Sequence, residues 1–83
     1  MTRPELLEEA GRLLYGDRWQ RQLARALDVN ERTVRNWVEE RTPVPLTRLR
    51  EVLELLAARE KEFSPTCARI SDFLEREFSS AEN

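Results

Sequence analysis

The residues best suited to chemistry lie close together in the segment 31–40. Arg32, Arg35 and Asn36 can each make paired hydrogen bonds, because an arginine can donate two to O6 and N7 of guanine and an asparagine can pair with N6 and N7 of adenine. Glu31 can accept a hydrogen bond from N4 of cytosine, or it can pair with Arg35 one helical turn later. The spacing leaves both roles of Glu31 open. Recognition of base edges by such side chains requires a helix that holds them on one exposed face.

Other chemistry is hard to build from this chain of 83 residues. It contains no His, and its single cysteine, Cys67, cannot form an internal disulfide or a Cys/His zinc site. Without His, no side chain has an unperturbed pKa near neutrality for acid–base catalysis. A domain this small rarely encloses a small-molecule pocket. We therefore expect no enzymatic activity, no cofactor, no metal and no small-molecule substrate.

The net charge of −2 at pH 7 hides an uneven distribution. Residues 1–17 carry two Arg and four acidic residues (net −2), residues 18–50 carry eight Arg and four acidic residues (net +4), and residues 51–83 carry four basic and eight acidic residues (net −4). Arg suits paired contacts to phosphate and guanine. The basic segment indicates either chance clustering on a solvated surface or a contact surface for nucleic acid.

Apolar spacings of three and four residues, with only two Gly, predict helices almost throughout. Thr2 and Pro4 indicate the start of a first helix, which ends at Gly16. Its predicted apolar stripe consists of Leu6, Leu7, Ala10, Leu13 and Leu14. Asp17, followed by Gln20, predicts a cap for a second helix over 18–27.

The second half of the chain predicts three further helices. Asn30 suits the N-cap of a helix over 31–40, after a turn at 28–30. Two prolines make 42–45 a rigid loop, after which a fourth helix covers 46–62. Ser64 and Pro65 predict a break and a fifth helix to Phe78, followed by a frayed tail from Ser79 to Asn83. The expected fold is all-α, a compact bundle of about five helices, with a core domain over 1–62 and a C-terminal helix and tail over 63–83.

The helices over 18–27 and 31–40 have the spacing of a helix-turn-helix, in which the second helix enters the major groove. Ala24 supplies a small residue where the two helices cross, and Val34 and Trp37 are expected to face their shared core. Trp19 is expected to be buried as well. Cys67 is expected to be a small, at least half-buried hydrophobic residue without a function of its own.

The stretch LARALDVNERTVRNW resembles the Cro/C1-type (lambda-repressor-like) helix-turn-helix family of phage and bacterial transcriptional regulators. With the first helix, the RTPVP loop and the fourth helix included, the resemblance covers 4–62. The family usually has Gly where this chain has Asp28, a residue that also tolerates the left-handed conformation. Residues 65–83 do not align with the family. Small proteins of this kind include phage repressors, antitoxins and anti-CRISPR-associated autorepressors.

The resemblance implies double-stranded DNA as the partner and assigns residues to it. Those expected to contact bases are Asn30, Glu31, Arg32, Arg35 and Asn36. Those expected to contact phosphates are Gln20, Arg21, Thr33, Arg41 and Arg48. The predicted function is therefore a sequence-specific repressor, an autorepressor encoded by a phage or mobile element, acting on a palindromic operator.

One recognition helix reads only a few base pairs, so we expect a homodimer with two half-sites. The predicted dimer interface is Ile70, Phe73, Leu74 and Phe78, on the acidic C-terminal helix. The same stripe could instead pack against the first and fourth helices and complete a monomer core. The alternative function is a protein-interaction module, such as an antitoxin or adaptor, that works through the acidic half. No apolar run is long enough for a membrane span, and the first 16 residues do not resemble a secretory signal. We expect a cytoplasmic protein.

Overall fold

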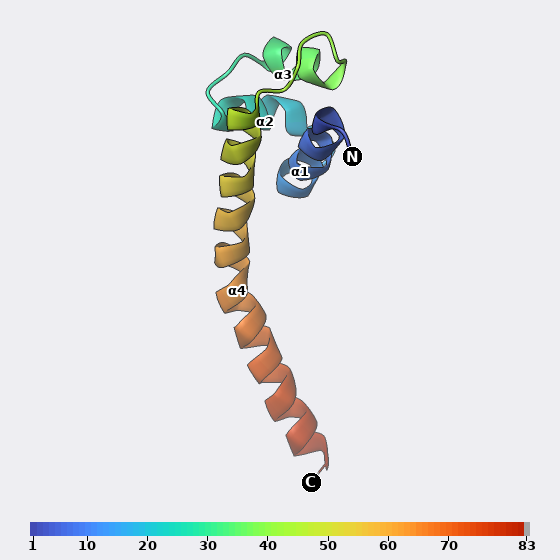
Figure 1. Ribbon diagram of the computed structural model, residues 1–83. Coiled ribbons are helices and arrows are strands. Elements are labelled where there is room, and N and C mark those ends of the chain that lie inside the picture. Colours follow the sequence, from blue (N-terminus) through green and yellow to red (C-terminus); the bar gives the residue numbers. More distant parts are fainter. Residues whose placement is uncertain (83) are drawn as a thin grey trace.

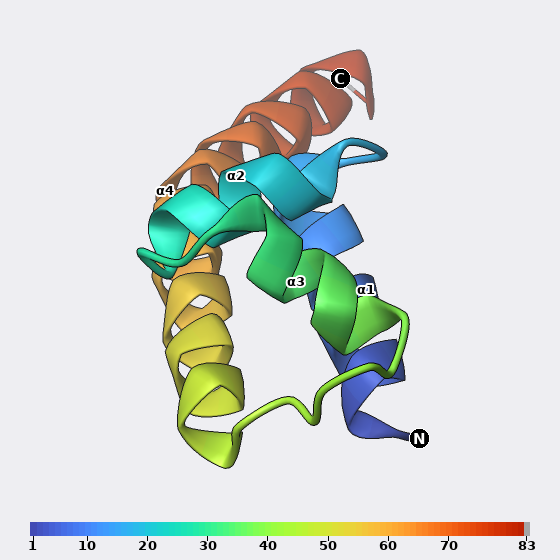
Figure 2. The same ribbon diagram turned by 90° about the horizontal axis from the view of Figure 1, so that it is seen from above.

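The computed structural model describes the backbone of residues 1–82 and the side chains of residues 1–79. The described residues form four α-helices and no strand: α1 (Arg3–Tyr15), α2 (Trp19–Ala26), α3 (Glu31–Val38) and α4 (Leu46–Glu82) (Figure 1). Figure 1 and Figure 2 show α2 and α3 together at one end of the molecule, and α4 packs against α1. We call residues 1–59 the head and residues 60–82, which project away from it, the stalk. None of the described helices is both long and apolar enough to cross a membrane.

The ends of α1 match the sequence-based prediction. The hydroxyl of Thr2 accepts a hydrogen bond of 3.3 Å from the backbone N–H of Glu5, and Pro4 lies in the first turn. Gly16 ends the helix at φ 82°, a conformation that glycine adopts without steric cost. The predicted cap of α2 is wrong, because Arg18 is the N-cap residue and makes no side-chain capping bond. Asp17 instead lies 3.5 Å from the guanidinium of Arg12.

The connection between α2 and α3 is a tight turn built on one left-handed residue. Asp28 has φ 56°, and the backbone N–H of Val29 donates to the carbonyl of Ala24 over 2.9 Å. This bond pattern satisfies carbonyls at the C-terminus of α2 that would otherwise lack partners. The side chain of Asn30 then accepts from the N–H of Arg32 over 3.0 Å and caps α3. Both the left-handed Asp28 and the Asn30 cap confirm the sequence-based prediction.

Replacing Asp28 by Gly should raise the free energy of unfolding by about 0.5 to 1 kcal/mol, because glycine adopts a positive φ without the clash of a Cβ atom. In thermal denaturation this corresponds to a midpoint about 3 to 6 °C higher. Asp28→Ala is the control and should lower the midpoint, since alanine lacks the local hydrogen bonding that helps Asp adopt this conformation. An unchanged midpoint in both variants would show that the turn is not strained.

The core lies where α1, α2 and α3 meet the first turns of α4. Its buried hydrophobic residues are Leu7, Ala10, Leu14, Trp19, Leu23, Ala24, Leu27, Val34, Trp37, Val44 and Val52. Gly11 is also buried, and a Cβ atom there would come within 2.1 Å of the ring of Trp19. Leu6 and Leu13 were predicted on the apolar stripe of α1 but are exposed. Leu7, Ala10 and Leu14 of the same stripe are buried as predicted, and Gly11 faces Trp19 beside them.

The prediction of five helices in a compact bundle is wrong, because α4 runs unbroken from Leu46 to Glu82 with Pro65 inside it. Proline removes one backbone hydrogen bond, and here the carbonyl four residues earlier belongs to exposed Lys61, which water can reach. Figure 1 shows α4 changing direction near this point, as expected at a proline. The tail predicted to fray is helical over 79–82, and Asn83 lies outside the described residues.

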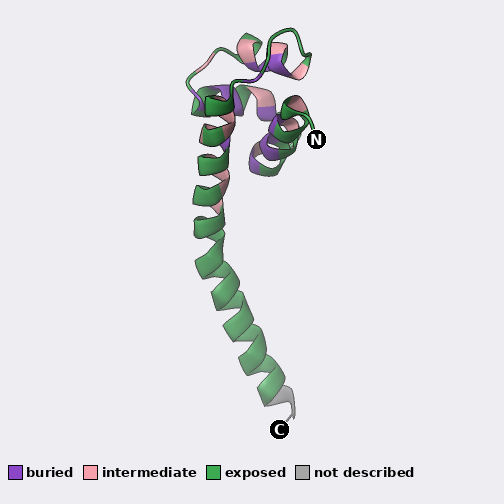
Figure 3. Cartoon of the chain, viewed as in Figure 1, coloured by how far each residue is buried: buried purple, intermediate pink, exposed green. Residues whose placement is uncertain are grey.

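The stalk makes the molecule long. The chain measures 63 × 21 × 18 Å and has a radius of gyration of 18.0 Å, against about 12 Å for a compact domain of this length. Every residue from 60 to 79 is exposed (Figure 3). The alternative in which the C-terminal stripe completes a monomer core is therefore wrong. The prediction that Cys67 is at least half-buried is also wrong, because this residue is exposed.

Candidate nucleic-acid interface

α3 has one buried side and one polar side. Val34 and Trp37 are buried against the rest of the head. Of the residues predicted to contact bases, four are exposed and Asn36 is half-buried; the exposed four are Asn30, Glu31, Arg32 and Arg35. Their shared position on a short, well-packed helix gives them a fixed orientation relative to the head. The exposed side is thus polar, and two arginines project from it.

Glu31 and Arg35 are paired across one turn of α3. The carboxylate lies 3.8 Å from the guanidinium, and both side chains are about half exposed, at 45% and 54%. The structure thus contains the ion pair that was one of the two roles expected for Glu31. An exposed pair of this kind is weak and contributes little to stability. Its main effect is to restrict the orientation of Arg35.

Asn30 and Asn36, near the two ends of α3, each accept a hydrogen bond from within the chain. The side-chain oxygen of Asn30 is used in capping, which leaves its amide group as a donor. At the other end, the backbone carbonyl of Asn36 accepts from the N–H of Arg41 over 2.9 Å. The side chain of Asn36 has no hydrogen bond to another part of the described chain and is partly exposed, so both its amide and its oxygen can contact a ligand.

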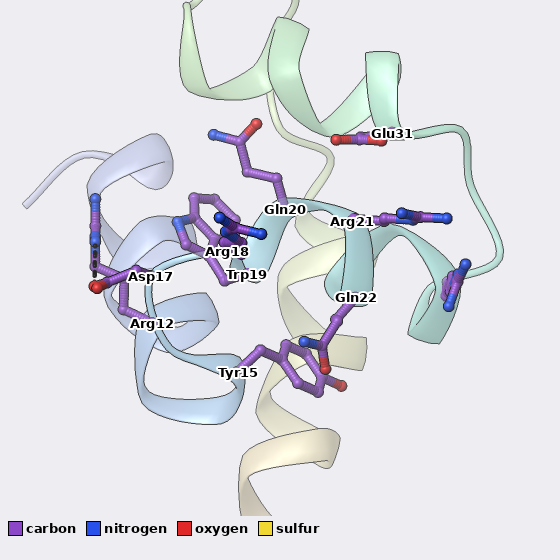
Figure 4. Close-up of a pocket in the computed structure, with 10 residues that line it drawn as sticks. Arg12, Tyr15, Asp17, Arg18, Trp19, Gln20, Arg21, Gln22 and Glu31 are labelled. Atoms are coloured by element: carbon purple, nitrogen blue, oxygen red, sulfur yellow. Dashed lines mark hydrogen bonds and ion pairs between the residues drawn. The ribbon is translucent and has the colours of Figure 1, made fainter.

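A hollow of about 800 Å³ lies beside α3, between the end of α1 and the outer side of α2 (Figure 4). Gln20 and Arg21, both predicted to contact phosphate, line it. The α2 N-terminus at this hollow has no side-chain cap, so its first backbone N–H groups remain available to an anion. The other lining residues are Arg12, Tyr15, Asp17, Arg18, Trp19, Gln22, Arg25 and Glu31.

Arg18 and Arg25 also line this hollow, although neither was predicted as a site residue. They lie three residues before and four residues after Arg21, and residues at that spacing share one face of a helix. Their helical spacing relative to Arg21 could therefore have predicted both residues from the sequence. Four arginines and two acidic residues surround the hollow, so its surroundings carry an excess of positive charge.

The other residues predicted to contact phosphates either bond within the chain or are half-buried. Arg48 donates to the backbone carbonyl of Leu27 over 3.0 Å and to the carboxylate of Glu51 over 2.9 Å. It therefore ties α4 to the turn between α2 and α3. Arg41 is exposed but pairs with Glu39 over 3.1 Å. Thr33 is half-buried in the first half of α3.

The four residues predicted at a dimer interface lie on the stalk, far from the polar side of α3 in the fold. Ile70, Phe73, Leu74 and Phe78 are all exposed, as is Phe63, which sequence analysis did not select. Among the described residues, no group of His, Cys, Asp and Glu is arranged to hold a metal ion. Comparisons of the chain with protein-family models, with curated proteins and with solved structures give no match.

Proposed function

We propose that this chain is a sequence-specific repressor of transcription that binds double-stranded DNA as a homodimer. In this proposal α2 and α3 act as a helix-turn-helix, and the polar side of α3 enters the major groove. One observation carries the proposal: α3 is packed against the head by Val34 and Trp37 while its opposite side exposes Arg32 and Arg35 next to an arginine-lined hollow.

In the proposed interface one set of residues recognises bases and another binds phosphates. Arg32, Arg35 and Asn36 would read base edges, with Glu31 orienting Arg35 rather than binding a base. The arginines around the hollow would hold the phosphate backbone, which supplies affinity without sequence preference. Arg48 drops out of the phosphate set in this proposal, because its guanidinium already bonds within the chain.

The charge distribution supports the same surface. Residues 18–50 carry a net charge of +4, whereas residues 51–83 carry −4. The stalk would be repelled by phosphate, so DNA would bind at the end of the molecule formed by α2 and α3. A single head contacts few phosphates and few bases, and two heads on adjacent half-sites would give tight and selective binding.

The test uses fluorescence anisotropy with labelled duplexes selected by the protein from a random pool of about 30 base pairs. Tight binding to the selected sequence, weaker binding to a scrambled duplex, and a steep loss of affinity with added salt are expected. If selection enriches no sequence, the specific repressor proposal is wrong. Binding that is equally tight on all duplexes would leave only a non-specific DNA-binding protein.

Arg32→Ala and Arg35→Ala should each cost about 1 to 3 kcal/mol of binding to the selected duplex while leaving the fold intact. Arg21→Ala should weaken binding to all duplexes equally and lower the salt slope by about one unit. Arg69→Ala is the matched control, because it removes an exposed arginine from the stalk. Equal losses on selected and scrambled duplexes would demote Arg32 and Arg35 to phosphate contacts.

A protein-interaction module is the second candidate, favoured by the uncovered apolar side chains on the acidic stalk. In that case the stalk would hold a different protein, and the head would have no measurable affinity for DNA. The anisotropy measurement separates the two, since a pure interaction module would not retain any duplex even at low salt.

A further inference from the structure

The uncovered side chains of the stalk follow a heptad pattern. Phe63, Cys67, Ile70 and Leu74 are spaced by four, three and four residues, which makes them successive d, a, d and a positions. Residues at these positions form one narrow seam along a helix. Phe73 and Phe78 fall at the flanking g and e positions and widen the seam. All of these side chains are exposed.

The other sides of the stalk do not compete with this seam. Pro65 falls at position f, opposite the seam, so its ring and the lost backbone hydrogen bond face away from anything that covers the apolar residues. The charged residues Arg69, Asp72, Glu75 and Arg76 lie at the outer positions c, f, b and c, whereas Glu77 takes the d position after Leu74 and ends the apolar seam. Thr66 and Ser71, at the g and e positions beside the seam, are uncharged.

No other part of the described chain covers the seam. The last contact of the head along this helix is the ring of Tyr15, the final residue of α1, whose centroid lies 6.0 Å from the guanidinium carbon of Arg59. Beyond Arg59 every described side chain of the stalk is exposed. Figure 1 shows the stalk leaning toward the side of α4 on which α1 lies. Because no described residue of the head covers the stalk, a partner for the seam must come from another molecule.

The amount of apolar surface suits a second copy of the stalk. Phe63, Phe73 and Phe78 are 57%, 55% and 66% exposed, so each ring can bury on the order of 100 Å². With Ile70 and Leu74, two copies would together bury about 1,000 Å², the size at which stable interfaces begin.

Resting on the proposed function, we infer that two stalks pair in parallel and in register. Two heads must lie at the same end of the dimer to reach half-sites about 34 to 36 Å apart on one duplex. An antiparallel pair would place the heads at opposite ends of a stalk about 34 Å long. Parallel pairing also sets Phe73 of one copy beside Phe78 of the other, since g and e positions five residues apart adjoin. The antiparallel alignment that keeps the seam paired would set Phe73 beside Thr66.

The native Cys67 makes the pairing measurable, because a parallel, in-register seam brings the Cys67 residues of two copies level with each other. Mild oxidation of the wild-type protein, without DNA, should convert most chains to a disulfide-linked dimer on a non-reducing gel. The matched control is Cys67→Ser with Asp72→Cys, which moves the thiol to the outer side and should cross-link about tenfold more slowly. Absence of the Cys67 disulfide, or equally fast cross-linking of the control, would overturn the inference.

A mixture of two variants tests the opposite orientation. Phe63→Cys and Leu74→Cys, each combined with Cys67→Ser, should form only disulfides between identical chains. A disulfide between the two different chains would show antiparallel pairing and contradict the inference. These experiments contain no DNA, so their failure leaves the DNA-binding proposal standing. Conversely, parallel cross-linking in a protein that retains no duplex would remove only that proposal.

Phe73→Glu with Phe78→Glu should give a folded monomer in light scattering, because two carboxylates enter the seam of each copy. The variant should also lose binding to a palindromic duplex. Ala68→Glu with Ser79→Glu adds the same charge at outer positions and should remain a dimer. A persistent dimer in the Phe73 and Phe78 variant would contradict pairing through the stalk.

Discussion

Trp37→Ala should lower the free energy of unfolding by about 3 to 5 kcal/mol. The indole is buried in α3 and packs in the core formed with the other head helices. Removing it leaves a cavity at the point that holds α3 against the head. A chain of 83 residues has a total stability of about 4 to 12 kcal/mol, so this loss takes away a large share. The proposed DNA binding should weaken to the extent that the head unfolds.

Urea denaturation followed by the fluorescence of Trp19, the tryptophan that remains in this variant, measures this loss directly. Leu13→Ala provides the control, since its side chain is 75% exposed and its removal should change stability by less than about 0.5 kcal/mol. A Trp37→Ala protein as stable as the wild type would mean that α3 is not anchored by its indole.

Gly11→Ala should also destabilise the protein strongly, by about 3 kcal/mol. Helix propensity alone predicts the opposite, because alanine in place of glycine inside a helix normally gains about 1 kcal/mol. The new Cβ atom, however, would lie within 2.1, 2.6 and 2.9 Å of three ring atoms of Trp19. That ring is only 1% exposed, so adding the Cβ atom must displace the packed ring or move α1 away from α2.

A double-mutant cycle with Trp19→Leu checks this reason for the loss. In the Trp19→Leu background the ring is absent, and Gly11→Ala should then be neutral or slightly stabilising. If Gly11→Ala were equally harmful in both backgrounds, contact with Trp19 would not explain the effect. If it were stabilising in the wild type, helix propensity would dominate, and the close approach of α1 to α2 would be relaxed at little cost.

The helix ends show which features of the fold could be predicted. The caps at Thr2 and Asn30 and the left-handed Asp28 depend on hydrogen bonds and sterics within a few residues, and all three were predicted. The cap at Asp17 was predicted by the same reasoning and is wrong, because α2 begins one residue later, with Arg18 as its N-cap.

The errors in α1 and α4 have a tertiary origin. The buried side of α1 includes Gly11, which packs against Trp19, and a glycine gives no hydrophobic signal in the sequence. Pro65 was expected to separate a fourth helix from a fifth. In the structure nothing packs against residues 60–79, so the lost backbone bond stays in water and the helix continues.

The candidate interface likewise has some features that could be predicted from the sequence and others that could not. The alternation of buried Val34 and Trp37 with exposed Arg32 and Arg35 follows from helix periodicity and could be predicted. The bond from Arg48 to the carbonyl of Leu27 joins residues 21 positions apart, which no local pattern reveals. The hollow between α1 and α2 likewise exists only after the helices have packed.

Because the stalk is exposed, its helix content is expected to depend on the concentration of the protein. An isolated helix of about 20 residues is only marginally stable in water, and residues 60–79 have no tertiary contacts within the chain. Their amide protons in a single chain should therefore exchange with solvent far faster than those of the head. Pairing of two stalks, as inferred above, would protect the stalk by mass action, and its helix content should then rise as the protein accumulates. A cell that makes little of this protein would then hold well-folded heads on largely unwound stalks.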